Sequence, residues 1–165
     1  MPTTPNQIVE TQIQPQAIAD DWVGPKSEYE RYGPNQMIGS FTAGIRTGVD
    51  RLVALADEQF GFNKQKAGEL TASVLEELRE RDFHPVFAKL KITNWDEFEI
   101  LIALPKNEFL DDNLLRVLDY TSEMEQRETN AAFSIAFHFF GKGEDYFDKK
   151  VISDGYIYFH KSLAQ

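Results

Sequence analysis

Hydrophobic positions follow a helical period between residues 49 and 81. Apolar side chains recur there at intervals of three and four residues, at Val49, Leu52, Val53, Ala56 and Phe60 and again at Ala67, Leu70, Val74, Leu75 and Leu78. This spacing places them on one face of a helix and predicts an amphipathic segment. Because Gly61 stands where glycine commonly ends a helix, we expect two helices, one ending near residue 60 and one covering residues 64–81.

The period changes to two residues after Pro85. Apolar and polar residues alternate over residues 86–93 and again over residues 97–104, as they do in strands with one buried face. The residues between them, Thr93 to Asp96, predict a turn, so that the two strands form a hairpin.

One further helix and two further strands are predicted in the rest of the chain. Asp111 and Asp112 open the helix, since negative charge is favourable at a helix N-terminus. A third strand is predicted over residues 130–140 and a fourth over residues 155–163, with a charged loop, residues 141–154, between them. The predicted core contains Leu70, Val74, Leu78, Ile100, Ile102, Leu118, Ile135 and Phe137.

These elements predict an α+β fold. The order helix, helix, strand, strand, helix, strand, strand is typical of about three helices packed on one face of a mainly antiparallel four-stranded sheet. A fifth strand from the N-terminal residues remains an alternative. The layout is ferredoxin-like by analogy only, and the analogy carries no function.

The first 34 residues differ in composition from the rest. Five of the seven prolines lie there, and proline at this density disfavours helix. We therefore expect an extended Pro-rich arm, residues 1–34, followed by a single α+β domain, residues 35–165. Trp22, Tyr29 and Tyr32 are its predicted anchors, because aromatic side chains bury large areas. The arm would pack on its own body or on another chain.

Composition excludes several classes of function. The net charge is −10 and the pI is about 4.7, whereas a nucleic-acid surface needs a basic face. The chain has no cysteine, which excludes disulfides, zinc–thiolate sites and thiol nucleophiles. It has neither an 18-residue apolar run nor a secretory leader pattern, so we expect a cytoplasmic protein that binds no membrane. No motif indicates a cofactor or a metal.

Two of the three histidines fall on the last two predicted strands. If these strands pair, His138, His160 and Tyr158 lie on the same non-core face. Two imidazoles beside a phenol could act as a general acid–base pair or as half of a metal site. The simpler interpretation is an aromatic sheet face that packs against another element.

Negative charge is concentrated between residues 94 and 128. Ten carboxylates oppose three basic residues there, and such a field steers association with a basic partner. A solvated face and a divalent-metal site are the alternatives, although no metal-binding spacing is present. Aromatic side chains are expected to be exposed on the sheet face opposite the helices, where they need a cover. The predicted partner-binding residues combine both features: Glu97, Glu99, Asp119, Glu123, Phe140, Tyr156 and Tyr158.

The sequence favours a non-catalytic protein–protein interaction protein, such as a small acidic subunit, an adaptor or a chaperone-like module. Its partner would be another protein or a second copy of the chain, in a homo-oligomer or a larger assembly. One alternative is an enzyme or small-ligand-binding domain that uses His138, His160 and Tyr158. The other is an acidic inhibitor of a basic enzyme, of the immunity or antitoxin type. The distance between the two histidines separates the first interpretation from the second.

Overall fold

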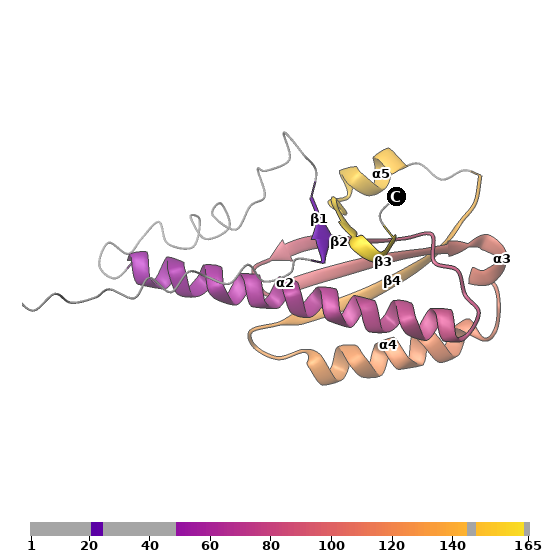
Figure 1. Cartoon of the computed structure of the whole chain (residues 1–165), viewed down its shortest axis with the longest axis horizontal. Helices are drawn as coiled ribbons and strands as arrows, with labels where there is room; N and C mark the ends of the chain where they lie inside the picture. The colour runs from indigo at the N-terminus through magenta and orange to yellow at the C-terminus, as the bar shows by residue number, and fades with distance from the viewer. Residues whose placement is uncertain (1–20, 25–48, 145–147, 164–165) are drawn as a thin grey trace, which may run out of the picture.

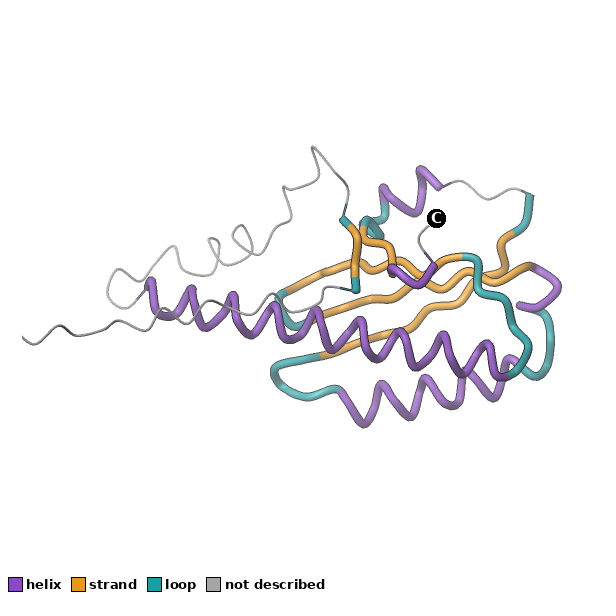
Figure 2. Tube along the Cα trace, viewed as in Figure 1, coloured by secondary structure: helices purple, strands orange, loops and turns teal. Residues whose placement is uncertain are grey.

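One mixed sheet of five strands forms the centre of the structure. The computed structural model describes residues 21–24, 49–144 and 148–163 (Figures 1 and 2). Its elements in chain order are β1 (Trp22–Val23), α2 (Val49–Glu80), β2 (Phe87–Asn94), β3 (Glu97–Pro105), α3 (Lys106–Phe109), α4 (Leu114–Glu128), β4 (Ser134–Lys142), α5 (Asp148–Ser153), β5 (Tyr158–His160) and the 3-10 helix η2 (Lys161–Leu163). The predicted α+β class is confirmed.

The sheet is mixed: three of its four described strand pairs are antiparallel, as expected of a mainly antiparallel sheet, and one pair, β3 with β4, is parallel. The predicted hairpin is confirmed, because β2 and β3 pair in antiparallel orientation. Helix α4 then carries the chain back, and β4 lies parallel to β3, as the tube in Figure 2 shows. The last two strands, whose pairing the sequence left open, are not neighbours: the strand order is β1-β5-β2-β3-β4, so that β2 and β3 separate β5 from β4. The four-stranded antiparallel, ferredoxin-like layout is matched only in part.

The last strand is shorter than predicted. Only residues 158–160 form β5, which pairs with β2 at Lys89 and Leu90. The segment predicted as a loop, residues 141–154, contains the end of β4 and the short helix α5. The alternative of a fifth, N-terminal strand is realised in β1, which pairs with β5. Trp22 is 3% exposed and anchors β1, whereas Tyr29, Tyr32 and the remainder of the predicted arm lie outside the described residues.

Helix α2 is one continuous helix of 32 residues, and the predicted break at Gly61 is wrong. A glycine inside a helix costs about 1 kcal/mol relative to alanine, and packing on both sides of it outweighs that cost. Phe60 and Ala67 are buried in the core. The buried amide of Asn63 donates to the carbonyl oxygens of Trp95 and Ala132 at 3.3 and 2.8 Å. Neither α2 nor any other described helix is both long enough and apolar enough to cross a bilayer.

The core lies between the sheet and the two helices α2 and α4, which run side by side in Figure 1. The described core residues that were predicted and are buried are Val74, Leu78, Ile100, Ile102, Ile135 and Phe137. Leu70 is half-buried against this core. The assignment of Leu118 to the core is wrong, because it is 37% exposed. Its position beside the buried Val117 and Thr121 puts it at the border of the helix's buried stripe.

The other face of the sheet is partly covered by the chain itself. Phe87 and Lys89 of β2 are both buried, and the Lys89 side chain is 1% exposed. Its ammonium group pairs with the carboxylate of Asp148, the first residue of α5, and lies 4.6 Å from the centre of the Phe159 ring. Helix α5 is thereby held on the face opposite α2. Part of the aromatic area that was expected to need an external cover therefore has an internal one.

Candidate functional site

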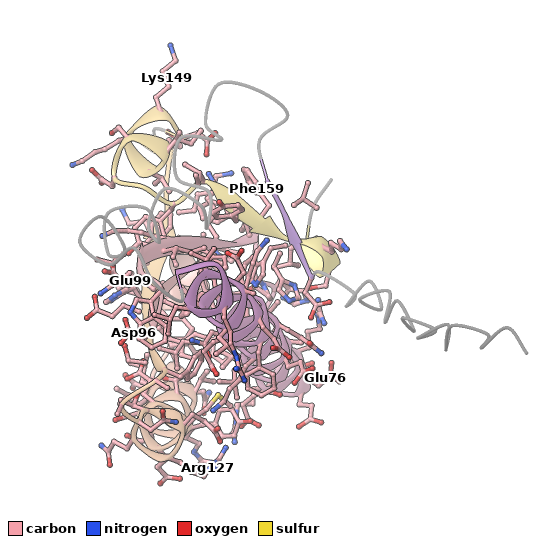
Figure 3. The ribbon with its side chains drawn as sticks, turned by 90° about the vertical axis from the view of Figure 1, so that its left-hand side faces the viewer. Glu76, Asp96, Glu99, Arg127, Lys149 and Phe159 are labelled. Carbon is pink, nitrogen blue, oxygen red and sulfur yellow. The ribbon has the colours of Figure 1, made fainter. Side chains whose placement is uncertain are left out.

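Glu99 is the centre of a polar cluster on the sheet face that α2 does not cover. It lies opposite Lys91 in the ladder of β2 and β3. Its carboxylate accepts hydrogen bonds from the Tyr156 hydroxyl at 3.0 Å, from Thr93 Oγ1 at 3.0 Å and from Lys91 Nζ at 3.3 Å. Figure 3 looks along α2 and shows Glu99 on the side away from that helix. We name Lys91, Thr93, Glu99 and Tyr156 the Glu99 cluster.

The two histidines of the predicted site lie on opposite faces of the sheet. His138 pairs with Leu101 in the ladder of β3 and β4, is half exposed, and has Nε2 3.8 Å from Glu99 Oε2. His160 is buried on the α2 side, with Nε2 3.3 Å from the carbonyl oxygen of Gly68. The expectation that His138, His160 and Tyr158 share a face is wrong. The assignment failed because β5 has packing partners on both faces, so alternation alone did not show which face meets the helices.

The contacts of His160 link neighbouring elements of the fold. Its ring lies edge-on to the Trp22 ring with 5.0 Å between ring centroids, and Nδ1 lies 2.8 Å from Ser162 Oγ. Burial lowers the pKa of His160 and outweighs the opposing effect of the Gly68 carbonyl. The neutral imidazole therefore joins β1, α2 and β5.

Hydrogen bonds and burial in the Glu99 cluster determine which of its groups carries a proton. Burial raises the pKa of Glu99, but the hydrogen bonds from Tyr156, Lys91 and Thr93 outweigh it and leave the pKa below its usual value. Burial, followed by the hydrogen bond to Glu99, raises the pKa of Tyr156 well above that of a free phenol. The phenol thus remains a donor and the carboxylate an acceptor at neutral pH. Both pKa values are therefore shifted away from neutral pH, whereas an efficient general acid or base has a pKa near it. The cluster indicates a fixed hydrogen-bond network more than a proton-transfer site.

A pocket of about 790 Å³ adjoins the Glu99 cluster. It opens where β5 leaves the edge of β2, and its lining residues are Lys91, Ile92, Lys149, Ile152, Ser153, Asp154, Gly155, Ile157 and Tyr158. Gly155 has φ +98°, and a Cβ added there would lie 3.3 Å from the stem of Lys91. Lys149 points away from the body of the molecule in Figure 3. Of the two lysines that line the pocket, Lys91 is the one held against its wall, and its ammonium group is paired with Glu99.

Helix α4 carries a mixed apolar and acidic surface on the side that does not meet the core. Leu115 is 60% exposed and Leu118 is 37% exposed. Residues three and four apart lie beside one another on a helix, and Asp119, Ser122 and Glu123 continue the exposed side of α4 from the two leucines. We name these exposed residues the α4 outer face, together with Asp112 in the turn before the helix: Asp112, Leu115, Leu118, Asp119, Ser122 and Glu123. Arg116 lies at its border, so carboxylates outnumber the cation on it.

The predicted partner-binding residues do not form one surface. Glu99 and Tyr156 belong to the Glu99 cluster, and Glu97 is exposed at the start of β3. Phe140 packs against Phe87 at 5.6 Å between ring centroids. Tyr158 faces α2, where Lys64 Nζ lies 5.2 Å from its ring centre. Glu99 and Tyr156 therefore lie together on the sheet, whereas Asp119 and Glu123 lie together on a separate surface, the α4 outer face. Alternation and helical spacing place residues on a face of one element, but they do not show which elements are neighbours.

Residues suited to hold a metal do not converge in the described part of the chain: no group of three His, Cys, Asp or Glu residues is arranged around a common point there. Compared with known proteins, the chain matches no family model, no curated protein and no solved structure.

Proposed function

We propose that this protein is a non-catalytic docking module that binds a basic, partly apolar segment of a partner protein on the α4 outer face. The observation that carries the proposal is the exposure of Leu115 and Leu118 beside Asp112, Asp119 and Glu123. An isolated exposed leucine needs no explanation. Two leucines on one helix face, bordered by carboxylates, form a surface that favours a partner with both apolar and basic side chains.

The magnitudes support a moderate, salt-sensitive affinity. Full burial of a leucine side chain is worth about 1.5–3 kcal/mol, and both leucines of this face are only partly buried in the free protein. Lysine or arginine side chains of the partner would pair with exposed carboxylates, and such pairs contribute roughly 0–1 kcal/mol each. The apolar contacts would therefore supply most of the affinity, while the charges would supply the association rate and the choice of partner.

A peptide-display selection on the full chain tests this proposal. Random twelve-residue peptides are selected against the protein, and the affinities of the enriched peptides are measured by fluorescence anisotropy at low and physiological salt. We expect enriched peptides to combine lysine or arginine with leucine, isoleucine or phenylalanine, and to bind more weakly as salt rises. Leu115→Ser and the pair Asp119→Lys with Glu123→Lys should each weaken binding. Glu76→Lys, at an exposed position of α2, is the matched control.

Two outcomes would contradict the docking proposal. Either the selection enriches no basic peptides, or the enriched peptides bind all variants equally. An inhibitor of a basic enzyme would use the same acidic face, so it is a special case of this proposal in which the bound segment borders an active site. An enzyme built on His138 and His160 has no support, since the sheet lies between the two imidazoles.

Small-ligand binding at the pocket beside the Glu99 cluster is the second candidate function. Its volume of about 790 Å³ lies within the range typical of ligand sites, roughly 300–1,000 Å³. Ile92, Ile152 and Ile157 supply apolar walls. Screening small-molecule fragments by ligand-observed NMR, with Ile152→Asp as the blocking variant, tests it. Binding that Ile152→Asp leaves unchanged would place the fragments elsewhere.

A further inference from the structure

Strand β4 ends the sheet on the side next to α4. In the described part of the chain it pairs with β3 on one side, and no strand pairs with it on the other. An outer strand presents backbone N–H and C=O groups that can pair with another chain. Which of these groups face outward can be derived from two hydrogen bonds.

The two hydrogen bonds fix the direction of every backbone group along β4. In a parallel ladder the N–H and C=O groups of one residue point to the same side, and successive residues alternate. The N–H of Ser134 donates to the carbonyl oxygen of Asp96 at 2.6 Å, so Ser134 faces β3. The N–H of Phe137 donates to Glu125 Oε1 at 2.5 Å, so Phe137 faces α4. The backbone groups of Phe139 and Gly141 therefore also point away from β3.

We propose that the partner segment binds in extended form, as an additional strand paired with residues 139–141 of β4. This inference rests on the proposed docking function and specifies its geometry. Glu125 already occupies the N–H of Phe137, so pairing would begin at Phe139 and run toward Gly141. Helix α4 runs antiparallel to β4 in the β3–α4–β4 crossover. The turns N-terminal to Glu125, which carry Leu115 and Leu118, therefore lie beside this part of the strand.

The chemistry of the surface selects a basic partner over a second copy of this chain. Two copies joined edge to edge through β4 would bring two α4 outer faces together, with Asp112, Asp119 and Glu123 present twice. Like charges in close contact oppose such pairing. An extended segment with apolar side chains on the face toward α4 and lysine or arginine beside them would instead satisfy the backbone groups, the leucines and the carboxylates together.

N-methylation of the partner peptide tests the strand geometry without changing the protein. A peptide enriched on the full chain is synthesised with one backbone nitrogen methylated at a time. Because successive N–H groups of a strand point to opposite sides, we expect only alternate positions to be sensitive. Each sensitive position should weaken binding by about tenfold, the effect of losing one or two backbone hydrogen bonds. In the complex, amide hydrogen exchange at Phe139 and Gly141 should slow, whereas exchange at the exposed Thr129 should not.

The outcomes separate this inference from the docking proposal. A peptide that needs Leu115 but tolerates methylation at every nitrogen would overturn strand addition and leave docking on α4 intact. Failure to select any basic peptide would remove both. Sedimentation of the free protein as a dimer, with Phe139 and Gly141 protected in a concentration-dependent way, would overturn the inference by assigning the edge to a second copy.

Discussion

Replacing Asp148 by asparagine should destabilise the protein by about 2 kcal/mol. The ammonium group of Lys89 is buried, while the Asp148 carboxylate is 53% exposed. Removing one partner of a fully buried pair costs about 3–5 kcal/mol, and fully exposed pairs contribute roughly 0–1 kcal/mol. This pair lies between those limits, because water screens one of its two charges. Lys89→Met should cost less, about 1 kcal/mol or under, since it leaves no buried charge and keeps the contact with Phe87 and Phe159.

Urea unfolding of the single and double variants measures the pair directly. The difference between the double variant and the sum of the single variants gives the coupling energy, which we expect to be about 1–2 kcal/mol. Asp119→Asn, an exposed carboxylate on α4, is the matched control and should change stability by about 0.5 kcal/mol or less. A loss for Asp148→Asn no larger than that of the control would refute the argument that this ion pair holds α5 on the sheet.

Three further predictions concern the core, a turn and a histidine. Ile102→Ala should cost about 2–5 kcal/mol in urea unfolding, because the residue is fully buried and a cavity would remain; a loss below 1 kcal/mol would contradict its placement. Gly155→Ala should destabilise by about 1–2 kcal/mol through its positive φ and the close stem of Lys91, whereas an unchanged midpoint would argue against this turn. The free energy of unfolding should fall as pH drops below about 6.5, because the pKa of His160 is lowered in the folded state and the unfolded state therefore binds the proton first. The acid sensitivity should shrink in His160→Gln more than in His138→Gln.

Elements with a local pattern could be predicted from the sequence. The hairpin of β2 and β3 follows from alternation interrupted by a short turn, and both strands lie where they were expected. The inward face of β4, with Ile135 and Phe137, was also assigned correctly. In these segments one face meets the core and the other does not, so the pattern of apolar residues carries the necessary information.

The incorrect assignments concern contacts between segments distant in sequence. Alternation places Lys89 on the sheet face opposite the helices, but it does not show that α5 covers this residue. The continuity of α2 through Gly61 depends on Asn63, whose partners lie on the hairpin turn and before β4. His138 and His160 lie far apart because β4, which carries His138, pairs with β3, whereas β5, which carries His160, pairs with β2. Each outcome is decided by tertiary neighbours, which periodicity along one element does not encode.

The position of β5 between β1 and β2 determines the order in which the sheet can be completed. The hairpin of β2 and β3 and its α4 crossover to β4 form from neighbouring segments, so they can assemble early, when loop closure is short. The contact of β1 with β5 joins the two most distant described strands and carries the largest closure entropy. Until β5 arrives, β2 has an unpaired edge. We therefore expect a refolding intermediate in which the region from α2 to β4 is formed while Trp22 remains accessible to solvent.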